Sequence, residues 1–275
     1  MLKPRLIPVL LLKNGILVRS RAFTFHQHTG DPLGQVERYT AWKADELIYL
    51  DINRDDTHDF RETMSVIGST SSNKNIPATM TNDVVSVIRF VSEKCMIPLT
   101  VGGKIRTIED IRVRLKNGAD KVSINTQALD DPSFITEAAR TFGNQCIIVC
   151  IDVKRDPKTG QCEVYRRFGR EPTGRTPEAW AKEVERLGAG EILLQSIDRD
   201  GTGMGYDLPL IRSVAEAVSI PVIALGGVGK FSDFVAGLTE GKASAVAAAN
   251  IFHFSEQSII HAKREMQAGG IDVRL

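Results

Sequence analysis

Short apolar runs of strand length alternate along this chain with longer amphipathic stretches of helix length. The apolar runs predict strands over Arg5–Leu12, Glu46–Asp51, Pro98–Val101, Lys121–Ile124, Ile147–Val153, Glu191–Gln195, Pro221–Ala224 and Ala245–Ala249. The amphipathic stretches predict helices over Pro32–Lys43, Asn82–Lys94, Thr107–Asn117, Pro132–Phe142, Pro177–Leu187, Asp207–Val218, Phe231–Thr239 and Glu256–Gln267. Eight strands and eight helices in strict alternation predict an α/β fold, a single (β/α)8 TIM barrel over residues 1–275.

The two halves of the chain resemble each other. Ile7–Lys13 aligns with Ile148–Lys154, and Ala44–Ile48 aligns with Ala189–Leu193, at offsets of 141 and 145 residues. The repeat predicts two fused half-barrels. The first half carries about 21 extra residues after its second strand, so residues 53–81 are expected to form an inserted loop at the C-terminal face.

Charge and composition narrow the classes of function. The 35 basic and 34 acidic residues leave a net charge of +1, which gives no field to attract nucleic acid or an anionic membrane. The apolar stretch Leu6–Leu12 is too short to cross a bilayer, so a cytoplasmic protein is expected. The four cysteines, Cys95, Cys146, Cys150 and Cys162, show no CxxC spacing and no neighbouring histidine cluster, so neither a metal site nor a disulfide framework is expected. No cofactor motif is present either.

Two glycine pairs predict phosphate binding. Gly102-Gly103 follows the third expected strand and Gly226-Gly227 follows the seventh. Backbone N–H groups there can approach an anion without interference from a Cβ. The strands beside them end in small or hydrogen-bonding residues, namely Ser123, Asn125 and Thr126 in one half and Ala249 and Asn250 in the other. A ligand with a phosphate at each end fits this arrangement, and the alternative is that the glycines only form tight turns.

Carboxylates are expected at the same face. Asp152 stands inside the apolar run Ile147–Val153, where an unpaired carboxylate is costly, and it is the candidate catalytic residue. Asp51 ends the second strand, and Asp198 follows the sixth. Asp200, Gly201 and Thr202 are candidate substrate-binding residues, although Asp198 and Asp200 are also suited to capping the following turn.

Four charged residues stand at the opposite end of the barrel. Arg5, Glu46, Lys121 and Glu191 each come just before the apolar body of a strand, and their signs alternate. If they point inward, they form a ring of ion pairs that closes the barrel floor and can open for a small polar molecule. Their position at this end of the barrel alone favours a role of the four residues in stability.

The chain resembles the cyclase subunit of imidazole glycerol phosphate synthase, the HisF family, over nearly its whole length. The stretches that carry the resemblance are Gly30–Pro32, Ala44–Ile52, Gly118–Thr126, Gly188–Leu194, Ser196–Thr202, Ile251–Phe254 and Val273–Leu275. The resemblance implies a barrel that takes ammonia from a docked HisH-type class I glutaminase in a heterodimer and uses it on a phosphorylated small molecule. It further implies that Arg5, Glu46, Lys121 and Glu191 are the gate through which ammonia enters, which reverses the preference for a stability layer.

The chain departs from the family pattern at the C-terminal face, where the family's reaction takes place. Leu11 stands where the family's cyclase has its first catalytic Asp, while the second carboxylate remains as Asp152. Further departures are Arg19, Lys104, Gln195, Leu225 and Asn250. The pattern is similar to HisF-like paralogues of surface-polysaccharide clusters, which deliver ammonia for amidation or amidination of a sugar by a separate ATP-dependent amidotransferase. The alternatives are a working cyclase of histidine biosynthesis that relies on Asp152 alone, and a non-catalytic scaffold that activates the glutaminase.

Overall fold

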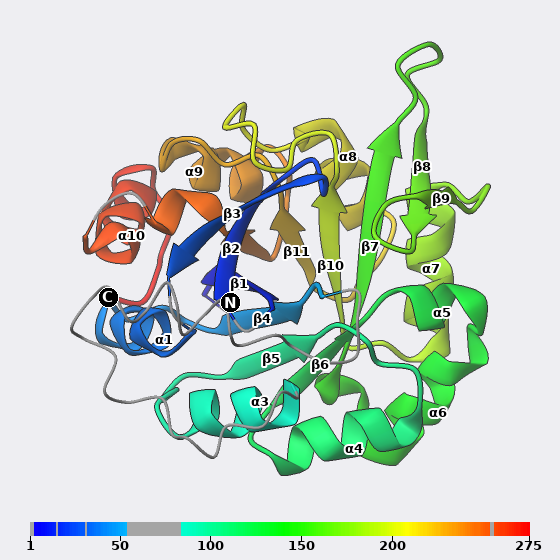
Figure 1. Cartoon of the computed structure of the whole chain (residues 1–275). Coiled ribbons are helices and arrows are strands. Elements are labelled where there is room, and N and C mark those ends of the chain that lie inside the picture. Colours follow the sequence, from blue (N-terminus) through cyan, green and yellow to red (C-terminus); the bar gives the residue numbers. More distant parts are fainter. Residues whose placement is uncertain (1–2, 15, 31, 54–83, 254–255) are drawn as a thin grey trace.

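The computed structural model describes residues 3–14, 16–30, 32–53, 84–253 and 256–275, and these form a closed barrel of parallel strands surrounded by helices (Figure 1). The barrel strands are β1 (Arg5–Lys13), β4 (Leu47–Asp51), β5 (Leu99–Gly102), β6 (Lys121–Ile124), β7 (Ile147–Arg155), β10 (Glu191–Ser196), β11 (Val222–Leu225) and β12 (Ala245–Ala248). Each strand pairs in parallel with the next, and the β10–β7 pairing closes the circle. The predicted (β/α)8 barrel is therefore confirmed.

Eight helices cover the outside of the described barrel at the positions that the amphipathic pattern predicts. They are α1 (Pro32–Ala41), α3 (Val84–Ser92), α4 (Ile108–Lys116), α6 (Ser133–Phe142), α7 (Pro177–Leu187), α8 (Leu208–Ala215), α9 (Ser232–Thr239) and α10 (Ser258–Ala268). Local chemistry sets several of their starts. Thr107 and Asp110 form a reciprocal capping box at α4, and Thr176 caps α7 ahead of Pro177.

The structure adds elements that the apolar pattern does not predict. β1 and β7 run on above the barrel and pair with antiparallel strands, so that β2 (Ile16–Arg21) and β3 (Phe25–Gly30) form a hairpin after β1, and β8 (Cys162–Arg166) and β9 (Glu171–Pro172) follow β7. Short helices α5 (Thr126–Asp130), η1 (Asn144–Cys146) and η2 (Asn250–His253) complete the described chain. The expected insertion 53–81 lies outside the described residues except for Asn53.

Alternate residues of each barrel strand face opposite sides, as the pleat of a strand requires. The residues that face outward pack against the helices in one large core, and a second apolar cluster fills the barrel interior. This inner cluster includes Ile7, Val9, Leu11, Ile48, Ile148, Cys150, Leu193, Ile223, Leu225, Ala245 and Ala247. By the same alternation, four buried polar residues face inward from neighbouring strands β5, β6, β7 and β10: Thr100, Ser123, Asp152 and Gln195. On β7 and β10 these polar residues alternate along the inner face with the apolar Ile148, Cys150 and Leu193.

The last helix is fastened to the first strand. Lys263 of α10 is 2% exposed, and its ammonium donates to the Asp45 carboxylate over 2.8 Å and to the Lys43 carbonyl oxygen over 2.6 Å. The other carboxylate oxygen of Asp45 accepts the Leu6 N–H over 2.8 Å. Asp45 thus links α10, the segment before β4, and β1.

Candidate functional site

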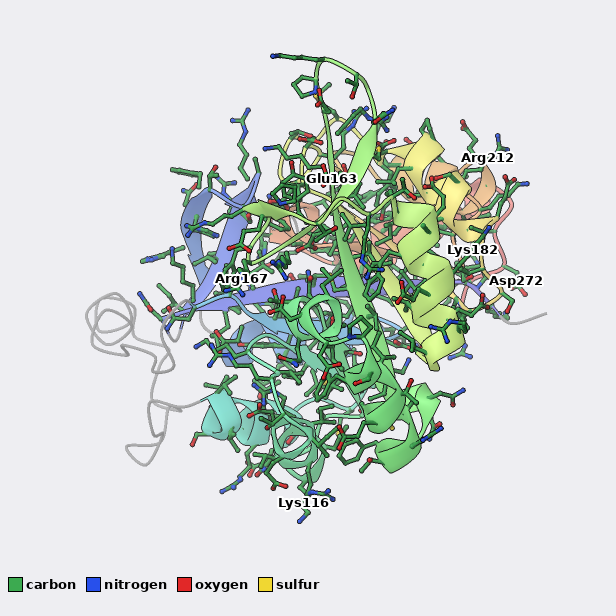
Figure 2. The ribbon with its side chains drawn as sticks, turned by 90° about the vertical axis from the view of Figure 1, so that its right-hand side faces the viewer. Lys116, Glu163, Arg167, Lys182, Arg212 and Asp272 are labelled. Atoms are coloured by element: carbon green, nitrogen blue, oxygen red, sulfur yellow. The ribbon has the colours of Figure 1, made fainter. Side chains whose placement is uncertain are left out.

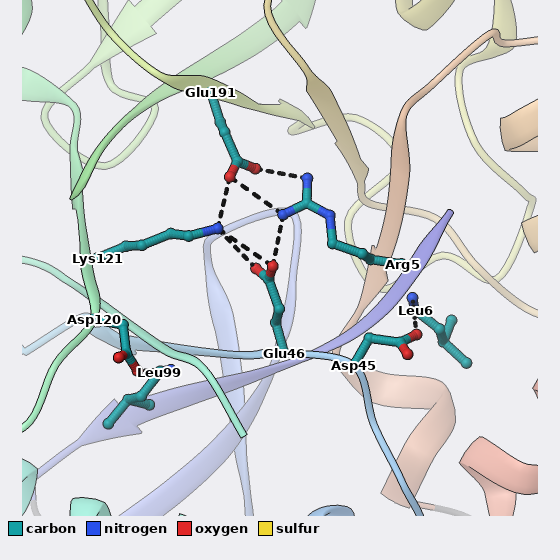
Figure 3. A network of polar contacts seen from close by, with 8 residues as sticks. All are labelled: Arg5, Leu6, Asp45, Glu46, Leu99, Asp120, Lys121 and Glu191. Atoms are coloured by element: carbon teal, nitrogen blue, oxygen red, sulfur yellow. Dashed lines mark hydrogen bonds and ion pairs between the residues drawn. The ribbon is translucent and has the colours of Figure 1, made fainter. Parts of the chain in front are cut away.

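The four charged residues of the floor form a closed ring (Figure 3). The Arg5 guanidinium donates to Glu46 over 2.7 Å and to both oxygens of Glu191 over 3.2 and 2.7 Å. The Lys121 ammonium lies 2.6 Å from Glu191 and 3.2 Å from Glu46, which completes the circle. The structure therefore brings these four predicted residues together at the end of the barrel where the strands begin.

Hydrogen bonds and attraction between opposite charges stabilise the ring against the desolvation cost of burying its side chains. The four side chains are 10–19% exposed. Burial disfavours the Arg5 guanidinium, but the hydrogen bonds and the attraction from Glu191 and Glu46 raise the pKa of Arg5 above its ordinary value. Burial likewise disfavours the Glu191 carboxylate, yet the hydrogen bonds from Arg5 and Lys121 lower its pKa. Both shifts favour the charged forms of Arg5 and Glu191, and the ring as a whole places two basic side chains against two acidic ones.

Asp152 lies at the other end of the interior, near the top of β7, and is 5% exposed. Its carboxylate accepts the Asn125 amide over 2.7 Å and the Cys150 thiol over 3.3 Å. Burial raises the pKa of Asp152 to about 6; the two hydrogen bonds oppose this rise, and the nearby Asp200 carboxylate adds to it. A carboxyl group that titrates near neutral pH can both accept and release a proton, which suits acid–base chemistry.

Asp200 is the second buried carboxylate of this face, at 7% exposure. It accepts the Ser20 hydroxyl over 2.7 Å and the Phe23 N–H over 3.3 Å, both from the β2–β3 hairpin. Burial raises the pKa of Asp200, and these two hydrogen bonds oppose that rise. Asp200 therefore ties the hairpin to the loop that follows β10.

The glycine pairs are required by the packing of the loops themselves. Gly103 and Gly227 have φ angles of 98° and 103°, in the region that favours glycine. A Cβ on Gly103 would collide with the Asp51 carbonyl oxygen, and one on Gly227 would collide with the Gly205 carbonyl oxygen. These contacts hold whether or not a phosphate binds, so the interpretation as tight turns remains open beside the phosphate interpretation.

Several other predicted binding residues already have partners in the described structure. Asn125 donates to Asp152, Thr126 accepts the Arg167 N–H over 3.1 Å, and Asn250 donates to the Ser20 carbonyl oxygen over 2.9 Å. Within the turn after β10, the Thr202 hydroxyl donates to the Arg199 carbonyl oxygen over 2.8 Å. Gly102, Ser123, Gly201, Gly226 and Ala249 lie at the C-terminal ends of the strands or in the loops that follow them, as predicted.

Three residues around the first glycine pair were not predicted to act together. The Lys104 ammonium lies 3.2 Å from the buried Asp51 carboxylate, which explains how Asp51 is tolerated there. Arg114 of α4 is 4% exposed and donates to the Gly103 carbonyl oxygen over 3.0 Å. Arg114 thus stabilises the turn at Gly102-Gly103. Its place on the buried face of an amphipathic helix is the only signal that the sequence offers.

Cys150 was also missed, although the strand period places it on the same inner face as Asp152. Its thiol is completely buried, and burial next to the Asp152 carboxylate raises its pKa well above the ordinary value. Cys150 is therefore a neutral hydrogen-bond donor to Asp152 and not a nucleophile.

The described residues include no cluster of three or more His, Cys, Asp or Glu side chains placed to hold a metal ion. None of the helices in the described ranges is both long enough and apolar enough to span a bilayer.

Comparison with known families agrees with the barrel fold. A family model described as "Histidine biosynthesis protein" matches residues 77–258, which is about two thirds of the chain and includes β5 to β12. The matched region contains Lys121 and Glu191 of the floor as well as Asp152 and both glycine pairs. The chain therefore belongs to the histidine biosynthesis protein family, the family of HisF and related TIM-barrel proteins.

Proposed function

We propose that this protein is a HisF-like synthase subunit that accepts ammonia from a HisH-type glutaminase and conducts it through the barrel to an acceptor at the C-terminal face. The acceptor chemistry is the amidation or amidination of a polysaccharide sugar, carried out with a separate amidotransferase. The original cyclase activity is lost or greatly reduced.

The observation that carries the proposal is the closed ring of Arg5, Glu46, Lys121 and Glu191. An apolar plug would close a barrel floor at lower cost, because each buried charge loses several kcal/mol of hydration. Four ion pairs can instead exchange partners around a passing polar molecule. The ring therefore suits an entrance better than a seal.

Polar residues along β6 support a route from this entrance. Lys121 begins β6, Ser123 lies on the same face of the strand, and Asn125 comes directly after the strand ends. Asn125 donates to Asp152, so hydrogen-bonding groups extend from the floor to the top of the barrel. A small neutral molecule such as ammonia can exchange hydrogen bonds along this line at a modest cost.

The residues at the C-terminal face of the barrel support the loss of the cyclase reaction. Leu11 is 8% exposed in the inner cluster, at the position where the family's cyclase has a catalytic Asp. A leucine can neither donate nor accept a proton, and acid–base assistance is worth about 10²- to 10⁴-fold in rate. The Lys104–Asp51 ion pair further occupies the turn of the first glycine pair with a cation that the family pattern lacks.

One observation favours the cyclase of histidine biosynthesis as a second candidate. Asp152 keeps a pKa of about 6 and two hydrogen-bond donors, which is the environment of a working acid–base group. A cyclase that relies on Asp152 alone accounts for this environment without any acceptor sugar.

Deletion of the gene in its own cells separates the candidates. The channel proposal expects the surface polysaccharide to lose its amidated or amidinated sugar while growth without histidine continues. Complementation with Arg5→Ala should restore the sugar only when the medium is rich in ammonium, whereas the wild-type chain should restore it at low ammonium. Histidine auxotrophy with an unchanged polysaccharide would establish the cyclase instead. If Arg5→Ala restores the modified sugar at low ammonium, the charged floor residues are not needed for ammonia transfer.

A further inference from the structure

Three loops at the C-terminal end of the barrel are joined into one surface. The Ala22 N–H of the β2–β3 turn donates to the Asp200 carbonyl oxygen over 3.0 Å. In the β8–β9 turn, a Cβ on Gly169 would lie 2.9 Å from Ile197 and 3.1 Å from Phe23, so this turn touches both of the others. We call residues 21–25, 167–170 and 197–205 the exit rim, and Arg167 marks its β8–β9 part beside the β2–β3 hairpin (Figure 2).

The exit rim carries most of the exposed large apolar side chains of the described residues. Those side chains are Phe25, Met96, Phe168, Met204 and Leu275. Phe25, Phe168 and Met204 belong to the exit rim and are 60%, 45% and 71% exposed. Phe25 begins β3, Phe168 lies between β8 and β9, and Met204 lies in the loop after β10, so the fold and not the local sequence brings their segments to one end of the barrel. Exposed apolar side chains on joined segments are typical of interaction surfaces.

Backbone strain holds one of these side chains in place. Arg167 and Phe168 have φ angles of 52° and 62°, in the left-handed region that is unfavourable for a residue with a Cβ. Two hydrogen bonds maintain the turn. The Arg167 N–H donates to the Thr126 hydroxyl oxygen over 3.1 Å, and the Arg170 N–H donates to the Arg166 carbonyl oxygen over 3.2 Å. Such strain persists where the surrounding structure imposes it, and it collects at binding sites.

The same loops expose cations. Arg166 and Arg167 pair with Asp130 and Glu171, so their charge is balanced locally. Arg21 and Arg170 are exposed, and neither has an acidic partner among the described residues. Aromatic residues, methionine and arginine are the types enriched at the centres of protein interfaces. The exit rim therefore fits a protein surface that offers both apolar and acidic side chains.

We propose that the exit rim is the docking surface for the acidic face of the enzyme that consumes the ammonia. This inference rests on the proposed channel, because the rim borders the end of the barrel opposite the charged floor. A consumer seated there receives ammonia directly from the interior, and the molecule is not diluted into bulk water. The apolar side chains anchor the partner, and Arg21 and Arg170 orient it by charge.

Photocrosslinking from both ends of the barrel tests where partners bind. The full chain carries p-benzoylphenylalanine at Phe168 or, as a control at the floor end, at Met96 in the loop before β5, and crosslinked proteins are identified by mass spectrometry. The Phe168 position is expected to capture a sugar-modifying, ATP-dependent enzyme through acidic peptides, and the Met96 position to capture the glutaminase. Capture from Phe168 of lipid, of the glutaminase, of a second copy of this chain, or of nothing would overturn the docking inference. Failure of the Met96 position to reach a glutaminase would instead count against the proposed function.

Affinity measurements on the purified pair then test the charges. The double variant Arg21→Glu with Arg170→Glu is expected to weaken the Kd for the captured enzyme at least 10-fold and to leave glutaminase binding unchanged. The control is Arg264→Glu on the exposed side of α10, which should change neither Kd. Equal affinity of the double variant and the wild type would overturn the inference.

Discussion

Replacing Asp152 by Asn should make the protein more stable while it removes any proton transfer at this site. Asp152 is buried, and burial raises its pKa from the ordinary 3.8 to about 6. At about 1.36 kcal/mol per pKa unit, this difference corresponds to about 3 kcal/mol of destabilisation of the folded state once the carboxyl is ionised. An Asn side chain carries no charge, and its oxygen still accepts the Asn125 amide. Its own amide faces the weak Cys150 sulfur acceptor, so a net gain of about 1–3 kcal/mol is expected above pH 7.

The gain has a specific dependence on pH. Between about pH 4 and pH 6 the folded wild-type chain binds more protons than the unfolded chain, so its free energy of unfolding falls as the pH rises through this window. The Asn variant lacks this titration. The difference between the two proteins should therefore be small at pH 4, grow up to about pH 7, and stay constant above it.

Urea unfolding followed by circular dichroism at pH 4.5, 6 and 8 measures the difference. Asp272→Asn is the control, because Asp272 is exposed and its partner, Lys3, is exposed as well. A variant that is less stable than the wild type at pH 8, or a difference that does not change with pH, would refute the reasoning. Loss of ligand-dependent turnover together with a gain in stability would place Asp152 among the residues whose position costs stability for the sake of activity.

Four further predictions follow from the geometry. Arg5→Ala removes one of the two cations that balance Glu46 and Glu191, so the free energy of unfolding measured in urea should fall by about 3 kcal/mol. Replacing all four floor residues by Met or Leu should restore near-native stability but abolish glutamine-dependent amidation. Leu11→Asp should raise the conversion of the phosphorylated substrate of the family's cyclase by about 10²- to 10⁴-fold in a chromatographic product assay, and no increase would mean that other departures block the reaction. Ser20→Ala leaves the buried Asp200 with one donor fewer and should speed amide hydrogen exchange in the β2–β3 hairpin, while the exposed Thr24→Ala should not. Gly227→Ala should lower the melting temperature and weaken phosphate-ester binding in calorimetry, because its Cβ meets the Gly205 carbonyl oxygen; unchanged binding would favour the turn interpretation.

The barrel could be predicted because its strands are buried on both faces. Ile147–Val153 and Glu191–Gln195 read as continuous apolar runs, since helices cover one side and the interior cluster fills the other. The floor charges could be recognised for the related reason that each interrupts such a run at its first residue, and the structure brings them within 2.6–3.2 Å of one another.

The loops could not be predicted because their order depends on contacts between distant parts of the chain. β3 is mostly exposed and polar, with no apolar period, and it is held through its pairing with β2, while Asp200 holds Ser20 of β2 and Phe23 of the turn from far along the chain. The sequence predicts Asn125 at a phosphate site, and in the structure its amide donates to Asp152. Nothing in either local sequence encodes that pairing, which arises only when β6 and β7 lie side by side.

The fastening of α10 by Lys263 couples the outer layer of helices to the charged ring. Asp45, which receives the Lys263 ammonium, immediately precedes Glu46 of the ring and also holds Leu6, the neighbour of Arg5. A change in α10 that removes the Lys263 ammonium therefore leaves the buried Asp45 carboxylate without its cation and loosens the backbone beside two of the four ring residues. The geometry of the barrel floor depends in this way on a helix that contributes no residue to it.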